Sequence, residues 1–506
     1  MAVTRWQPSA LVALATTTLL AAGPALAQCP DCTPPPCAGA AAQARPARNS
    51  IAVLTFENIT RDTSTQYLAE GLSDQIATRL GGVARLTMIS RSVVRRLRDP
   101  QELSIQQIGR TLNTVYLVNG TIRAASGRVR VNVEAVRAAS GEAVWSEAYD
   151  RASDDLIGLE EAIATEVAAG VAGRLSPQER RALGSRVTAD SRAYEQFLRG
   201  NVLMARRSPA SLEGAVAAYR AATVADSGFA DAYGRLAYVY ALCAWWGVCG
   251  RVDSVLAESR QAAARSLRLD SRSSDAWMGR ALMLAVWSQL TPAASNDSLL
   301  AALSGFRRAV DLNPRNAEAW HQFGALLRTV SDSASLDALH RALTLDPARG
   351  VTYFELSLTY ELMGRNDRAL ALVDSAVALE PDGPFRAQRT LYRLTGGDTL
   401  GAIADARRTP DQGWSPAVLA VFAHYSAAAR AMEARVEQQG CSSLGATYLL
   451  WTGRREQGVP FLLWCGATLW TRGYLRMPQL APLADDPRIQ ALRAESERIL
   501  ARARWR

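Results

Sequence analysis

A repeated helical pattern in the second half of the chain limits the fold more than any other feature. Small residues that suit the close crossing of two helices recur at Ala222, Ser266, Ala309, Ala342 and Ala376. The last two intervals are 33 and 34 residues, and the first two are 44 and 43, which leaves room for loop insertions of about ten residues. Units of this length pair two helices that cannot bury their apolar faces alone, so the pattern predicts an all-α superhelical solenoid.

Prolines mark the ends of the helices in this region. Pro314, Pro347 and Pro381 each follow the second helix of a unit, and the residue before a proline is disfavoured in the α conformation. With Trp320 and Tyr353 near the start of first helices, the units resemble tetratricopeptide (TPR) repeats. We expect a TPR solenoid over residues 190–470, with about five clear repeats and further degenerate ones, followed by a C-terminal capping segment over 471–506.

Strand and helix signals alternate over residues 50–186. The run Ile51–Phe56 is continuously apolar, as in a central strand, and residues 128–136 alternate between polar and apolar, as in a strand with one wet face. Helical spacing over 67–80 lies between these strands, and an amphipathic helix over 156–175 closes the unit. The order of strands and helices along the chain predicts an α+β domain, in which a mixed sheet carries helices on one face.

Five blocks of this domain resemble the TolB N-terminal-like (FlgO-like) domain. The blocks are Ile51–Asn58, Tyr67–Asp74, Ile89–Arg91, Val118–Ile122 and Gly141–Asp150. The resemblance implies an α/β fold that is commonly followed by TPR repeats in bacteria. Members are often fused to a DNA-binding winged helix, a kinase or a cyclase domain, and here an export signal stands in that place. This departure from the family argues against transcription regulation and cytoplasmic signalling.

The first residues are typical of an export signal. Arg5 precedes an apolar run over residues 10–22, and Ala25-Leu26-Ala27 matches the small-x-small cleavage pattern. We expect a signal peptide over 1–27, a Pro/Ala-rich linker over 28–49 and a periplasmic location. Cys29 is also a candidate for lipidation, although Gln28 departs from the small residue usual before it, and lipidation would place the protein at the outer membrane.

Seven cysteines leave one unpaired in an oxidising compartment. If Cys29 carries a lipid, three local pairs remain: Cys32 with Cys37, Cys243 with Cys249, and Cys441 with Cys465. The middle pair brackets Trp245 and Trp246. These tryptophans either form an exposed loop that contacts a partner or pack against the repeats.

The composition excludes several catalytic classes. The chain has no lysine and three histidines, so it has no P-loop lysine, kinase lysine or Schiff-base lysine. No catalytic, metal or cofactor motif is found, and we expect no enzyme activity. The carboxylate pair Glu160-Glu161 is expected to be solvated or to cap a helix. A cluster of arginines is read as a solvated face and not as a nucleic-acid site: Arg85, Arg91, Arg95, Arg96 and Arg98.

The inner face of the predicted superhelix offers a surface for a protein or peptide partner. Positions carried over from the TPR pattern place seven side chains on that groove: Tyr238, Met278, Leu282, His321, Arg328, Phe354 and Leu358. An alternative is that the chain's own C-terminal helices fill the groove.

These observations predict a non-catalytic periplasmic or envelope scaffold, a TPR adaptor with a TolB-like domain, that binds proteins and has no transmembrane span. The alternative is a cytoplasmic regulatory or signalling TPR protein that acts with a transcription regulator, kinase or cyclase. An enzyme is a third hypothesis, which the missing motifs disfavour.

Overall fold

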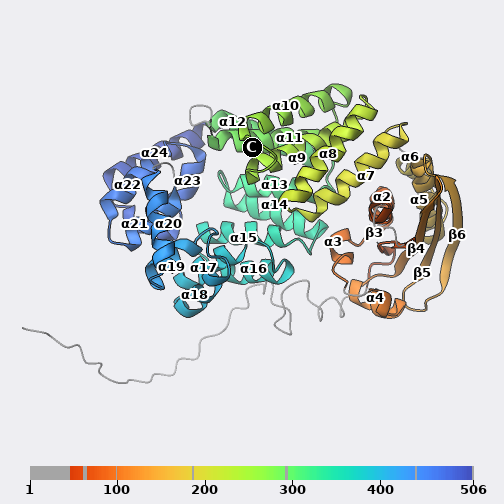
Figure 1. Ribbon diagram of the computed structural model, residues 1–506, viewed down its shortest axis with the longest axis horizontal. Coiled ribbons are helices and arrows are strands. Elements are labelled where there is room, and N and C mark those ends of the chain that lie inside the picture. The colour runs from red at the N-terminus through yellow and green to blue at the C-terminus, as the bar shows by residue number, and fades with distance from the viewer. Residues whose placement is uncertain are drawn as a thin grey trace, which may run out of the picture.

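The computed structural model describes residues 46–60, 65–97, 100–184, 187–290, 295–438 and 442–503. The predicted signal peptide, Cys29, Cys32 and Cys37 lie outside these residues, as do Arg98 and Cys441. The chain folds into a small mixed sheet with its helices, followed by a long series of helices (Figure 1). This is the fold class that the sequence predicts.

The sheet has six strands in the order β3-β1-β4-β5-β6, with β2 continuing β1 along β4. The strands are β1 (Ser50–Val53), β2 (Glu57–Asn58), β3 (Thr87–Met88), β4 (Tyr116–Ala125), β5 (Arg128–Arg137) and β6 (Ala143–Ala152). The first four pair in parallel, whereas β4, β5 and β6 form an antiparallel meander. The predicted alternation along β5 is present, because Val129, Val131 and Val133 are buried between exposed or half-buried polar neighbours.

Helices cover both faces of the sheet, and the prediction of helices on one face is wrong. Helices α2 (Gln66–Gly81) and α5 (Leu156–Ala172) pack on one face, against Ile51 and Val53. Helices α3 (Arg91–Val94) and α4 (Ile105–Leu112) cover the other face, against Ala52 and Leu54. Both faces of β1 are therefore buried, which explains its unbroken apolar sequence.

After α6 (Pro177–Leu183), the described helices pair into eight successive hairpins (Figure 1). The first five are α7 (Ser191–Arg206) with α8 (Pro209–Ala225), α9 (Ala230–Trp246) with α10 (Val252–Leu269), α11 (Ser274–Leu290) with α12 (Ser295–Leu312), α13 (Ala317–Leu327) with α14 (Asp332–Leu345), and α15 (Gly350–Leu362) with α16 (Asn366–Leu379). The last three are α17 (Arg386–Thr395) with α18 (Thr399–Arg408), α19 (Ser415–Phe422) with α20 (Ser426–Glu437), and α21 (Ser443–Trp451) with α22 (Arg455–Leu463).

Small residues let these helices approach one another closely. All five small residues that define the repeat have no exposed surface: Ala222, Ser266, Ala309, Ala342 and Ala376. A Cβ atom on Gly279 of α11 would lie 2.7 Å from the backbone nitrogen of Tyr238 in α9. The crossing of these two helices therefore requires glycine at position 279.

The end of the chain folds back on the hairpins. It contains α23 (Leu469–Tyr474), the 3₁₀ helix η4 (Pro478–Leu483) and α24 (Pro487–Arg502). Ile489 near the start of α24 packs in the core of α21 and α22, whereas Ile499 and Leu500 near its end contact the main core of the preceding hairpins. The C-terminal helices thereby return to the middle of the solenoid (Figure 1).

The sheet unit contacts the hairpins at two places. Tyr67 of α2 donates a hydrogen bond to Glu195 of α7, and Arg206 at the end of α7 lies 3.5 Å from Glu70. On the other side, Ser90 at the start of α3 donates to Asp346 in the turn after α14, at 3.0 Å. The sheet unit is thus held against both the first hairpin and the middle of the solenoid.

Candidate functional site

The structure places most of the predicted groove residues in the interior. Tyr238, Met278, Leu282 and His321 are buried, and only Phe354, Leu358 and Arg328 are partly exposed. The four buried residues therefore do not line an open groove, and that part of the prediction is wrong.

The tight winding of the superhelix explains this burial. Arg207, at the end of the first helix of the first hairpin, reaches Glu318 at the start of the fourth hairpin and forms an ion pair with it. Arg349 and the Tyr238 hydroxyl also bond to Glu318. Burial alone would raise the pKa of Glu318, but the Arg207 and Arg349 guanidiniums outweigh it and hold that pKa well below its ordinary value. The inner face is thus filled by an ionised network of the chain's own side chains.

His321 and Arg328 have structural partners. The His321 Nδ1 atom lies 3.1 Å from the Thr352 hydroxyl, and burial together with nearby Arg349 holds the His321 pKa well below its usual value. Arg328, directly after α13, donates a hydrogen bond to Glu355. Neither residue is an open binding group.

A disulfide joins Cys243 to Cys249, across the end of α9. Trp245 and Trp246 occupy the last turn of α9, with 50% and 42% of their surfaces exposed. They belong to a helix end and not to a separate loop. Cys465 is buried and takes part in a disulfide, whereas Cys441 lies outside the described residues, so their pairing stays a prediction.

A cleft of about 980 Å³ opens where β1 ends, between the sheet unit and α7. The strand order places β1 between β3 and β4. The chain runs from β1 to β3 through α2 on one face of the sheet, and from β3 to β4 through α3 and α4 on the other face. In parallel sheets this arrangement leaves a crevice at the carboxyl ends of the strands, where ligands commonly bind. Neither the apolar run of β1 nor any motif of the sequence predicted this cleft.

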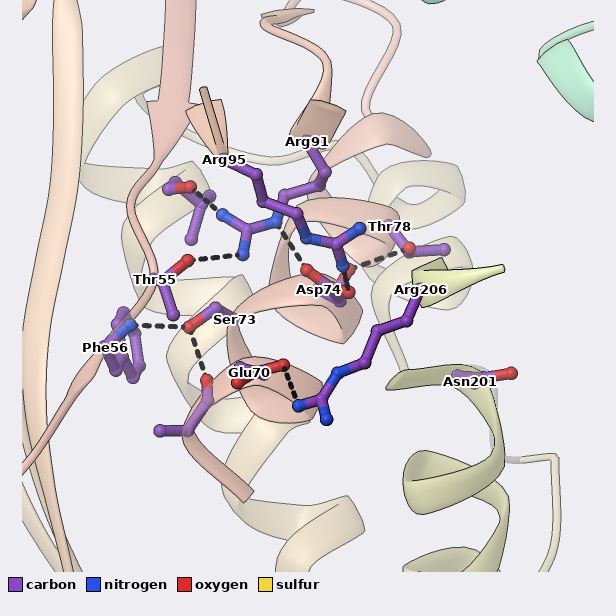
Figure 2. A network of polar contacts seen from close by, with 12 residues as sticks. Thr55, Phe56, Glu70, Ser73, Asp74, Thr78, Arg91, Arg95, Asn201 and Arg206 are labelled. Carbon is purple, nitrogen blue, oxygen red and sulfur yellow. Dashed lines mark hydrogen bonds and ion pairs between the residues drawn. The ribbon is translucent and has the colours of Figure 1, made fainter. Parts of the chain in front are cut away.

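A polar network holds the wall of the cleft in place (Figure 2). Arg91 donates to Asp74 at 2.5 Å and to Thr55 at 3.1 Å, and Arg95 also pairs with Asp74. Ser73 accepts a hydrogen bond from the Phe56 backbone at 2.9 Å. The network ties the end of β1 to α2 and α3, which form the wall of the cleft.

Three of the sequence blocks quoted above meet in this network. Phe56, Asp74 and Arg91 come from separate blocks, and folding brings them to one edge of the sheet. The blocks therefore contain residues of the site, but the sequence alone does not show that they meet there.

The lining of the cleft combines an apolar wall with a polar floor. Leu97, Ile105 and Ile108 belong to the wall, and Asn119 and Glu134 lie opposite them on the sheet. The Asn119 Oδ1 atom is buried without a hydrogen-bond partner among the described residues. The cleft can therefore accept a hydrogen bond from an N–H or O–H group of a molecule that also has an apolar part.

The predicted arginine cluster does not act as one solvated face. Arg85 pairs with Glu179 at 2.9 Å, Arg91 and Arg95 pair with Asp74, and Arg96 donates to the backbone oxygen of Leu379. These arginines join separate elements of the fold. The predicted solvation is therefore wrong for Arg91, whose side chain is 15% exposed, whereas Arg95 and Arg96 remain exposed.

No group of three or more histidine, cysteine or acidic side chains is arranged to hold a metal ion in the described part of the chain. No helix within the described ranges has both the length and the apolar character needed to cross a membrane.

Similarity to a known family covers the sheet unit. A family model described as the HilA/YgeH-like transcriptional regulator, second domain, matches residues 47–166, about a quarter of the chain. This description differs from the TolB-like resemblance, which stays a prediction.

"Putative adenylate cyclase 3" of Rhizobium meliloti (strain 1021) is 28% identical over 197 residues, or 38% of this chain and 33% of that protein. The chain thus matches about a third of the length of that relative.

Several solved structures that the chain resembles are TPR proteins. A thermophilic TPR protein from Thermus thermophilus is 18% identical and covers 40% of this chain and 99% of its own, with a TM-score of 0.34. A tetratricopeptide repeat protein from Parabacteroides merdae is 12% identical and covers 60% and 98%, with a TM-score of 0.32. The chain is therefore similar to a regulator domain in its sheet unit and to TPR proteins in its helical hairpins.

Proposed function

We propose that this chain is a non-catalytic scaffold that binds proteins. One observation carries the proposal: the hairpins already hold a polypeptide segment, residues 469–483 of the same chain, which we name the C-terminal segment. It contacts residues near the ends of helices in three successive hairpins. Trp470 donates to Ser288 at 2.8 Å, Arg476 pairs with Asp332, and Gln479 donates to Glu361 at 2.8 Å. A surface that recognises one segment by such contacts is suited to recognising others.

The proposed scaffold works outside the cytoplasm, in the periplasm or attached to the outer membrane through Cys29. The sequence of residues 1–27 supports export, and the disulfide between Cys243 and Cys249 supports an oxidising compartment. The TolB-like resemblance supports an adaptor role in the envelope.

A second candidate is a regulatory protein of the cytoplasm. The family match over residues 47–166 favours it, because that family is described as a transcriptional regulator. In this case the cleft at the end of β1 would serve a regulatory partner or ligand. Retention of residues 1–27 in the mature protein would distinguish this candidate from the exported scaffold.

The test is purification of the full-length chain, tagged at its C-terminus, from separated cell fractions. The proposal predicts a mature start at Gln28 or a lipidated Cys29, and one protein that co-purifies in constant proportion. A tagged exported protein of unrelated fold is the control. An intact Met1 in the cytoplasmic fraction would contradict export, and the absence of any constant companion would contradict the scaffold.

A further inference from the structure

A second concave surface lies on the outer side of the solenoid, away from the cleft. It is a groove of about 570 Å³ between α8 and α10, with α9 at its base. In Figure 1, α10 runs along the outer edge of the molecule. No residue of this outer groove belongs to the network that fills the inner face.

The outer groove is strongly basic. Four arginines line it, Arg220, Arg260, Arg265 and Arg268, against a single carboxylate, Glu258. Arg260 and Arg268 are exposed and form no ion pair within the described part of the chain. These two guanidiniums are available to bind an anionic group.

The base and one wall of the outer groove are apolar. Leu236 and Tyr240 of α9 are buried beneath it, and Val224 on α8 is 85% exposed at its edge. Arg265 lies over the Tyr233 ring, 5.9 Å from its centroid. A bound molecule would therefore meet an apolar strip beside a row of positive charges.

The spacing of the arginines indicates the shape of the bound molecule. Arg260 and Arg268 lie eight residues apart on one face of α10, which is about 12 Å at the rise of an α-helix. Carboxylates two turns apart on a second helix have the same spacing. An amphipathic helix could also place its apolar residues on Val224 and Leu236.

We propose that the outer groove between α8 and α10 binds an acidic amphipathic helix of a partner protein. The inference rests on the proposed scaffold function and names the partner's chemistry. The positive charge of the groove favours a negatively charged partner. The apolar strip favours a polypeptide over a single-stranded nucleic acid, which commonly binds by stacking its bases on exposed aromatic rings.

The test uses the full-length protein and a fluorescein-labelled synthetic helical peptide with glutamates along one face and leucines along the other. Fluorescence anisotropy measures its binding. The double variant Arg260→Glu with Arg268→Glu should weaken binding by about tenfold or more, because it replaces attraction with repulsion. The control variant Arg407→Glu with Arg408→Glu makes the same charge change on exposed residues of α18 and should stay within about twofold of wild type.

Three results would overturn the inference: no binding by the wild-type protein, an equal loss in both variants, or tighter binding of a single-stranded oligonucleotide than of the peptide. Circular dichroism checks that each variant is folded. A wild-type protein that fails to bind the peptide but still co-purifies with a constant companion would refute the groove and leave the scaffold standing.

Discussion

At the residue scale, burial decides what ionisable side chains do in this protein. Glu160 was expected to be solvated or to cap a helix, but it has no exposed surface and accepts hydrogen bonds from Tyr194 and Arg79. Burial raises its pKa from 4.5 to about 7, and the bonds from Tyr194 and Arg79 only partly oppose this rise. The sequence around Glu160 does not indicate this burial, because the hydrogen-bond partners of Glu160 lie 34 and 81 residues away in the chain.

The raised pKa of Glu160 makes stability depend on pH. A carboxyl group whose pKa is higher in the folded protein holds its proton more tightly there, so the free energy of unfolding falls as the pH rises from 4.5 to about 7. The full loss is about 3 kcal/mol. Glu160→Gln cannot ionise and should lack this decline, as measured by urea unfolding at pH 5 and pH 8.

The matched control is Glu213→Gln, which changes an exposed residue of α8. It should keep the decline of the wild-type protein. Because His321 and Asp231 also have shifted pKa values, the comparison with the variant decides: equal pH dependence of the wild-type protein and Glu160→Gln would show that the pKa of Glu160 is not raised.

At the element scale, the close approach of helices depends on particular glycines. Gly279→Ala would place a methyl group 2.7 Å from the Tyr238 nitrogen, and backbone cannot move aside as a side chain can. We expect a loss of about 1–3 kcal/mol in the free energy of unfolding, measured by urea denaturation. Gly473→Ala in α23 is the control, because no atom lies within 4 Å of its added Cβ, and it should not destabilise the protein. Equal effects of the two variants would refute the crossing argument.

The C-terminal segment is held by an ion pair that can be reversed. Arg476 binds both oxygens of Asp332, and Arg476→Glu would set two negative charges against each other. We expect a local loss of about 1–2 kcal/mol, or roughly five- to thirtyfold faster hydrogen exchange over residues 469–483. Adding Asp332→Arg should restore part of the protection. Unchanged exchange in Arg476→Glu would mean that the segment is held by its other contacts.

The elements themselves could largely be predicted from the sequence. Helical spacing and proline positions indicated the hairpins of α13 to α16, and the alternation of residues 128–136 indicated β5, because both patterns are local. The prediction placed α3 and α4 on the wrong face of the sheet, because both helices are short. Their contacts with the sheet depend on Ala52 and Leu54, which point away from Ile51 and Val53.

At the scale of the whole molecule, long-range contacts decide which surfaces remain open. The ion pair between Arg207 and Glu318 joins residues 111 positions apart, and it closes the inner face that the repeat pattern alone had left open. The repeat period determines the hairpins, but the small rotation between hairpins accumulates into the superhelix and is not visible in the period. Two concave surfaces that stay open among the described residues are the cleft at β1 and the outer groove.

The most direct test of the scaffold is photo-cross-linking in the cells that produce the chain. Amine-reactive reagents are unsuitable, because the chain has no lysine side chain to react with. A photoreactive benzophenone residue placed at Trp246, Arg260 or Arg408 samples three exposed surfaces of the full-length protein. The scaffold proposal predicts a light-dependent adduct with one protein from position 260 and none from position 408, in a chain that lacks residues 1–27. Adducts with no protein from any position, or adducts with cytoplasmic proteins on a chain that keeps Met1, would contradict it.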